Sequence, residues 1–183
     1  MNFKIKYTFV ALIFVLLLSC KADKEKTTVV EDIANLEAIN SNGKTAIETY
    51  DFAGFEKFLK FKNNKTYVIN FWATWCKPCV AELPHFEALY KNYKDKNVEV
   101  ILVSLDFPKK IDEGLIPFIE ENKLKSRIIL LDDPKQNEWI PKVDKNWSGA
   151  IPATVIYNKS DKGFYERSFT YAELEEQLNK FLN

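Results

Sequence analysis

The run 75–79, Trp-Cys-Lys-Pro-Cys, places two thiols three positions apart, and it constrains the fold more than any other feature of the chain. The run 67–72 before it is rich in β-branched and aromatic residues and predicts a β-strand. After Cys79, apolar residues recur at three- and four-residue spacing as far as Tyr93, which is typical of an amphipathic helix. The cysteines therefore lie where a strand passes into a helix, with Cys76 at the N-terminus of that helix.

This position determines the chemistry that we expect of the pair. The amides of a helix's first turn are unpaired and its dipole places roughly half a positive charge there, so both stabilise a thiolate. Such settings lower the cysteine pKa from about 8.5 to about 3.5–7.5. We expect the more exposed Cys76 to be the nucleophile and Cys79, one turn into the helix, to resolve the mixed disulfide. Pro78 fits the first turn, and an exposed Lys77 would assist the thiolate by its charge.

Two structural explanations of the cysteine pair are disfavoured. A structural zinc site needs about four ligands, and beyond the pair the chain offers only Cys20 and the single His85. A permanent structural disulfide would close a two-residue loop and constrain almost nothing in the unfolded chain. We therefore expect a redox pair, with no metal and no cofactor.

The first residues have the features of an export signal. Lys4 and Lys6 precede the apolar run 7–18, which is too short to span a bilayer. The run 17–20, Leu-Leu-Ser-Cys, resembles the lipobox of bacterial lipoproteins, in which the cysteine is lipidated and becomes the new N-terminus. We expect a signal peptide at 1–19 and a lipidated Cys20. The alternative is an ordinary secretory signal with a free Cys20.

Residues 20–44 are expected to form a lipid-anchored, flexible tether, and residues 45–183 a single domain. The run 21–26 mixes charges without an apolar period, and 40–43 reads Asn-Ser-Asn-Gly, which is rich in turn formers. The whole chain is 46% hydrophobic, enough for a packed core. Its 26 basic and 26 acidic residues balance, so nothing indicates a nucleic-acid partner.

Strand and helix patterns alternate along the rest of the chain. The expected strands cover 98–105, 127–131, 153–157 and 165–169, the last two joined as a hairpin. Helices are expected after an N-cap at Asp51, over 116–124, and after a capping box at 170–173. The pattern predicts the α/β class, with a sheet that finishes antiparallel.

This order of elements, with the Cys-x-x-Cys motif and the later Ile151-Pro152, closely resembles the thioredoxin fold over residues 45–183. Within that fold the run 70–76, Asn-Phe-Trp-Ala-Thr-Trp-Cys, and the pair Glu82-x-Pro84 resemble the membrane-tethered TlpA/ResA type, whose members are commonly lipoproteins. The resemblance implies a central mixed sheet flanked by helices, with the extra N-terminal and central elements of that type. It also implies a thiol-disulfide oxidoreductase.

The resemblance assigns roles to further residues. Pro152, preceded by Ile151, matches the cis-proline that lies against the disulfide and helps to receive the substrate chain. Trp75 is expected beside the disulfide as a contact surface for partners. Glu82 matches a partly buried glutamate that exchanges protons with Cys79, so that Glu82→Gln should change the thiol titration. A solvated surface glutamate is the alternative.

These features favour a disulfide reductant of the cell envelope, because Lys77 and Pro78 are similar to the reductant pattern, with proline second and no histidine. The resemblance implies protein disulfides as substrates, such as the haem-site cysteines of apocytochrome c. It also implies re-reduction by a thiol protein in the membrane. A disulfide oxidant or isomerase, a Cu(I) carrier and a thiol peroxidase are the alternatives. The roles of His85, Trp139 and Trp147 stay open.

Overall fold

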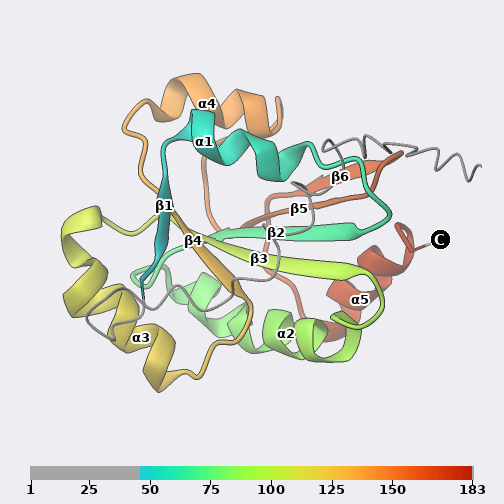
Figure 1. Cartoon of the computed structure of the whole chain (residues 1–183), viewed down its shortest axis with the longest axis horizontal. Helices are drawn as coiled ribbons and strands as arrows, with labels where there is room; N and C mark the ends of the chain where they lie inside the picture. The colour runs from blue at the N-terminus through green and yellow to red at the C-terminus, as the bar shows by residue number, and fades with distance from the viewer. Residues whose placement is uncertain (1–45, 183) are drawn as a thin grey trace, which may run out of the picture. The chain divides into compact units, whose positions relative to one another are not determined.

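The computed structural model describes residues 46–182, in which six strands form one sheet in the order β1-β4-β3-β2-β5-β6 (Figure 1). The expected signal peptide, the lipidated Cys20 and the tether lie outside the described residues. The strands are β1 Glu48–Tyr50, β2 Thr66–Trp72, β3 Val98–Ser104, β4 Arg127–Leu131, β5 Ala153–Tyr157 and β6 Lys162–Tyr165. The first four are parallel to one another, β5 pairs antiparallel with β2, and β6 pairs antiparallel with β5, which confirms the mixed sheet.

Helices cover both faces of this sheet (Figure 1). They are α1 Phe52–Phe55, α2 Lys77–Tyr93, α3 Ile116–Glu121, α4 Gln136–Val143 and α5 Tyr171–Asn179. Short 3₁₀ turns follow α1 (Glu56–Leu59) and β3 (Pro108–Lys110), and a π-helical turn, Ile111–Leu115, leads into α3. The elements β1 and α1 before β2, and the segment 108–121 between β3 and β4, correspond to the extra N-terminal and central elements that were expected.

The two layers of helices create two hydrophobic cores. Apolar side chains of α2, α3 and α5 pack on one face of the sheet, and those of α1 and α4 pack on the other. The central strand β2 is buried over its whole length because both faces are covered. Trp139 and Trp147, whose place the sequence left open, are both buried in the second core. The end of β2, where the cysteines follow, is therefore held by packing from both sides.

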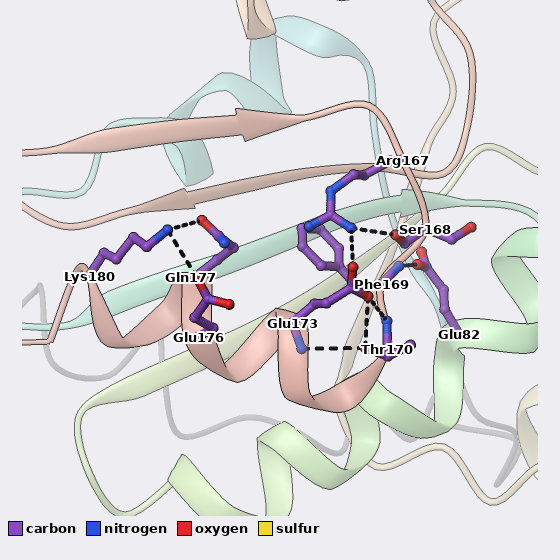
Figure 2. Close-up of polar contacts among 9 residues, drawn as sticks. All are labelled: Glu82, Arg167, Ser168, Phe169, Thr170, Glu173, Glu176, Gln177 and Lys180. Atoms are coloured by element: carbon purple, nitrogen blue, oxygen red, sulfur yellow. Dashed lines mark hydrogen bonds and ion pairs between the residues drawn. The ribbon is translucent and has the colours of Figure 1, made fainter.

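Local sequence signals explain where several helices begin. The Asp51 side chain accepts a hydrogen bond of 2.8 Å from the Gly54 backbone N–H and caps α1, as predicted. At α5, Thr170 and Glu173 form the predicted capping box, which Figure 2 shows. Hydrogen bonds between a cap and the first turn of its helix are readable from the sequence, because both partners lie within one turn. Pro84, by contrast, lies inside α2 and not at its start.

Two predicted boundaries were wrong. The second strand of the hairpin is Lys162–Tyr165 and not 165–169, because the residues after Tyr165 leave the ladder and bond elsewhere: Phe169 donates to Glu82. The helix predicted over 116–124 ends at Glu121, and Lys123 has a φ of 53°, a left-handed conformation that cannot continue a helix. The residue patterns alone predicted neither β1 nor α4, and the resemblance implied the extra N-terminal element without its bounds.

The packing of α2 on the sheet makes a testable difference between two phenylalanines. Phe86 of α2 is completely buried, whereas Phe107 is exposed. We predict that Phe86→Ala lowers the free energy of unfolding by about 3–5 kcal/mol, through lost apolar burial and the cavity left behind. Phe107→Ala, the matched control, should change it by less than about 0.5 kcal/mol. Urea unfolding of the two variants measures both values, and equal losses would contradict the packing described.

Candidate active site

The two cysteines lie at the start of α2, directly after the loop that leaves β2. They form a disulfide, with Cys76 as the N-cap of the helix and Cys79 in its first turn. The Cys79 backbone N–H lies 3.3 Å from the Cys76 sulfur and donates to it, so a first-turn amide faces the sulfur that was expected to carry negative charge. Cys76 is 6% exposed and Cys79 0%, so the N-terminal sulfur is the one that a partner can reach.

Four further predicted site residues surround Cys76. Trp75, Lys77 and Pro78 are exposed, and Lys77 and Pro78 occupy the first helical turn. The sulfur of Cys76 lies 3.7 Å from the carbonyl oxygen of Ile151, although the two residues are 75 positions apart in sequence. The fold therefore brings the loop before β5 against the Cys76 sulfur.

The peptide bond between Ile151 and Pro152 is cis, as the resemblance predicts for this position. Pro152 is buried and directly precedes β5, the neighbour of β2 in the sheet. Because the two strands are paired side by side, Pro152 lies at the same end of the sheet as the cysteines. The structure thus collects the exposed Trp75, the thiol pair and the Ile151 backbone at one edge.

Glu82 is buried on the same helix as Cys79 and one turn beyond it, with 2% of its surface exposed. Its Oε1 accepts a hydrogen bond of 2.9 Å from the Asn70 side chain on β2. Its Oε2 accepts one of 2.8 Å from the backbone N–H of Phe169, in the segment before α5 (Figure 2). The alternative of a solvated surface glutamate is therefore excluded.

Burial raises the pKa of Glu82 from its ordinary value to about 7, because desolvation penalises the charged carboxylate. The hydrogen bonds from Phe169 and Asn70, and the positive charge of Arg167, offset part of this effect. The Arg167 guanidinium lies 4.1 Å from the centre of the Phe169 ring and 2.9 Å from a Glu173 oxygen (Figure 2). A carboxyl group that titrates near neutral pH beside a thiol pair can exchange protons with it.

Asp106 is a site residue that the sequence analysis missed. It is buried after the end of β3, and its side chain accepts hydrogen bonds from the Thr74 N–H (3.1 and 3.2 Å) and from the Thr74 hydroxyl (2.6 Å). The Ser104 hydroxyl donates to it as well, at 2.8 Å. Asp106 thereby fixes the loop between β2 and Cys76. An aspartate after a buried strand was the only local signal for it.

Glu166 fixes the opposite loop and was also missed. Its carboxylate accepts hydrogen bonds from the Ser148 N–H (3.2 Å), from the Ser148 hydroxyl and from the Ala150 N–H (3.0 Å). Burial acts to raise the pKa of Glu166, but these three donors outweigh it and hold the pKa below its usual range. Through these hydrogen bonds Glu166 orders the segment that leads to Ile151 and Pro152. Its partners are 16 and 18 residues away in sequence, so no local signal could reveal it.

The structure also bears on His85, on metal ligands and on membrane-spanning helices. His85 lies half-buried on α2. Within residues 46–182, no three His, Cys, Asp or Glu side chains come together as metal ligands would. Within the same residues, every helix is too short or too polar to cross a membrane.

A protein family and several relatives align with most of the chain. The AhpC/TSA family matches residues 35–162. A thiol-disulfide oxidoreductase ResA of Bacillus thuringiensis is 36% identical over 141 residues, which cover 77% of this chain and 70% of the relative. A ResA of Bacillus cereus is 30% identical over 159 residues, 87% of this chain and 79% of the relative.

Solved structures share the fold. A thiol:disulfide interchange protein of Chlorobium tepidum aligns with a TM-score of 0.56 at 18% identity, over 70% of this chain and 85% of that one. The thioredoxin domain of a thiol-disulfide oxidoreductase from Bacteroides vulgatus aligns at 0.51 with 21% identity, over 70% and 84%. Both share the fold described above, a central mixed sheet flanked by helices. The chain belongs to the AhpC/TSA family of thioredoxin-like proteins and is a thiol-disulfide oxidoreductase of the ResA type.

Proposed function

We propose that this protein is a disulfide reductant of the cell envelope, which passes electrons from Cys76 and Cys79 to disulfides of exported proteins. The observation that carries the proposal is the buried Glu82 carboxyl, one turn beyond Cys79 and with a pKa of about 7. A reductant must deprotonate its second thiol to finish each reaction, and a carboxyl with this pKa on the same helix supports that role for Glu82. The proline at the second place between the cysteines agrees with the same direction.

The first step is attack by Cys76. In the reduced protein the Cys76 thiolate attacks one sulfur of the substrate disulfide, the substrate S–S bond breaks, and its other sulfur leaves as a thiolate. The start of α2 favours the attacking thiolate, because the Cys79 backbone N–H donates to the Cys76 sulfur and the positive end of the helix dipole faces it. The product is a mixed disulfide between Cys76 and the substrate.

The second step releases the substrate. The Cys79 thiol gives its proton to the Glu82 carboxylate, and the resulting thiolate attacks the Cys76 sulfur. The Cys76–Cys79 disulfide forms, and the second substrate sulfur leaves as a thiolate that takes up a proton from water. Two electrons have then passed to the substrate, and the protein is in the disulfide form that the structure shows.

The location is proposed from the sequence together with the topology. A lipidated Cys20 would hold the protein at the outer side of the cytoplasmic membrane, where a membrane thiol protein could reduce it again. Because β1 is parallel to β4, β3 and β2, the chain enters the sheet at the end opposite to Cys76. A flexible tether that joins the domain at that end agrees with an exchange site free to meet substrates. Apocytochrome c, with its pair of haem-site cysteines, is the substrate class proposed.

The direction of electron flow can be measured directly. We predict that the Cys76–Cys79 pair has a reduction potential near that of thioredoxin, about −270 mV. Equilibration with glutathione redox buffers, followed by trapping of free thiols, gives the value. A potential near that of the oxidant DsbA, about −120 mV, would mean that the protein makes disulfides and would overturn the reductant role.

The two cysteines should have different roles in substrate exchange. We predict that Cys79→Ser accumulates a mixed disulfide through Cys76, because the resolving thiol is gone, whereas Cys76→Ser traps nothing and loses all activity. Non-reducing electrophoresis of the variants after mixing with oxidised insulin measures this. Peroxide-driven turnover of the native protein with a thiol reductant, in place of insulin reduction, would favour a peroxidase.

The proton acceptor gives a pH signature. The pKa of Glu82 is about 7, so its carboxylate fraction, and with it the rate of the resolving step, should rise as the pH increases through 7. We predict that Glu82→Gln removes this rise and slows resolution at pH 7 about tenfold or more. The Asn70 Oδ1, which has no hydrogen-bond partner, can turn to accept from the new amide, so the variant should fold.

The control for this prediction lies on the same helix. Glu87 also binds backbone amides, those of Lys125 and Ser126, but far from the cysteines. Glu87→Gln should keep the native profile. Single-turnover reduction of insulin between pH 5.5 and 9 measures all three proteins, and a native inflection near 7 in Glu82→Gln would remove the carboxyl from the mechanism.

A further inference from the structure

Two large apolar side chains are strongly exposed in the described part of the chain. Trp75 is 58% exposed and Phe107 is 67% exposed, whereas the other aromatic residues lie buried or half-buried. Exposed aromatic side chains are costly to leave in water and are enriched at sites of protein contact. A surface that carries both residues is therefore a candidate site of protein contact.

The topology brings these two residues to the same edge of the molecule. Strands β2 and β3 are parallel neighbours, with Trp72 paired to Ser104 at their ends. The pairing continues beyond the strands, because the Leu105 N–H donates to the Trp72 carbonyl at 2.8 Å. Thr74 then bonds to Asp106 through both its N–H and its hydroxyl. Trp75 and Phe107 are the next residue on each side.

The loops that carry the two aromatic residues are held in place. The Asp106 side chain joins Thr74 of one loop to Ser104 at the base of the other, and it is buried. Pro108 directly follows Phe107 and opens a 3₁₀ turn, which restricts the backbone on the far side. The exposure of Phe107 thus belongs to a fixed loop and not to a chain end.

We propose that Phe107 extends the substrate-binding surface beyond Trp75, and that this surface binds an apolar side chain next to the reacting cysteine of a substrate polypeptide. The occupant follows from continuity with the exchange site. Trp75 directly precedes Cys76, so a polypeptide joined to Cys76 lies close to Trp75. The segment 105–107, between β3 and the 3₁₀ turn Pro108–Lys110, then contributes to substrate choice. This inference rests on the proposed function for the reductase assay that tests it, whereas the placement of Trp75 and Phe107 does not depend on that function.

The test uses two synthetic peptides with an intramolecular disulfide. They are identical except that the residues flanking each cysteine are phenylalanine in one and serine in the other. The native protein should reduce the phenylalanine peptide with about tenfold higher kcat/KM than the serine peptide, the effect of one buried aromatic contact. In Phe107→Ala this ratio should fall below about threefold. Phe107→Leu should keep most of it.

A neighbouring variant serves as the control. Lys109 is exposed in the same turn, so Lys109→Ala should leave the ratio at its native value. Circular dichroism and urea unfolding establish that Phe107→Ala is folded, as its exposure predicts. A native ratio near one, or an unchanged ratio in Phe107→Ala, overturns the docking surface while leaving the reductase assay intact.

Failure of the proposed function gives a different result. If the native protein oxidises the reduced peptides and does not reduce the oxidised ones, the reductant role fails. The same pair of peptides then reports docking in the direction of oxidation, because the ratio depends on contact with the polypeptide and not on the direction of electron flow. Loss of selectivity in Phe107→Ala supports the surface in either direction.

Discussion

The hydrogen bonds to the buried Glu82 carboxyl connect the parts of the structure on which the thiol chemistry depends. Burial of a charged carboxylate is costly, and the fold compensates for it with one donor from Asn70 on β2 and one from the Phe169 backbone before α5. Compensation is incomplete, and the pKa of Glu82 stays at about 7. The same contacts that tie α2 to β2 and to the segment before α5 thus leave a carboxyl that titrates near neutral pH one helical turn beyond Cys79.

Acidic side chains have a second role around the disulfide, as anchors for backbone. Asp106 binds the loop before Cys76, and Glu166 binds the loop before Pro152. Each accepts several hydrogen bonds from a single short segment, so each fixes the orientation of that segment more firmly than one bond would. Cys76 consequently lies between two loops that are held by hydrogen bonds within the protein itself. Such ordering reduces the conformational entropy that is lost when a substrate binds.

Sequence reasoning succeeded where both partners of an interaction are close in the chain. The thiol pair at the helix start, the Asp51 cap and the capping box at α5 depend on residues within one turn of each other. It failed at β6, whose end is set by contacts across the fold. The anchoring roles of Asp106 and Glu166 were missed for the same reason, since the loops that they hold, at Thr74 and at 148–150, are distant in sequence. The short edge strand β1 has too few residues to show a period.

The placement of Glu82 also links function to stability. Its pKa in the folded protein lies above the usual value of a glutamate, so the folded state holds this proton more tightly than the unfolded state. The stability that it contributes is fully present below the unfolded pKa and is lost as the pH rises through about 7. A fully paired or exposed carboxyl would avoid this loss, but its pKa would then lie far from neutral pH. The buried, partly compensated site therefore gives up stability near neutral pH for a group that can take the Cys79 proton there.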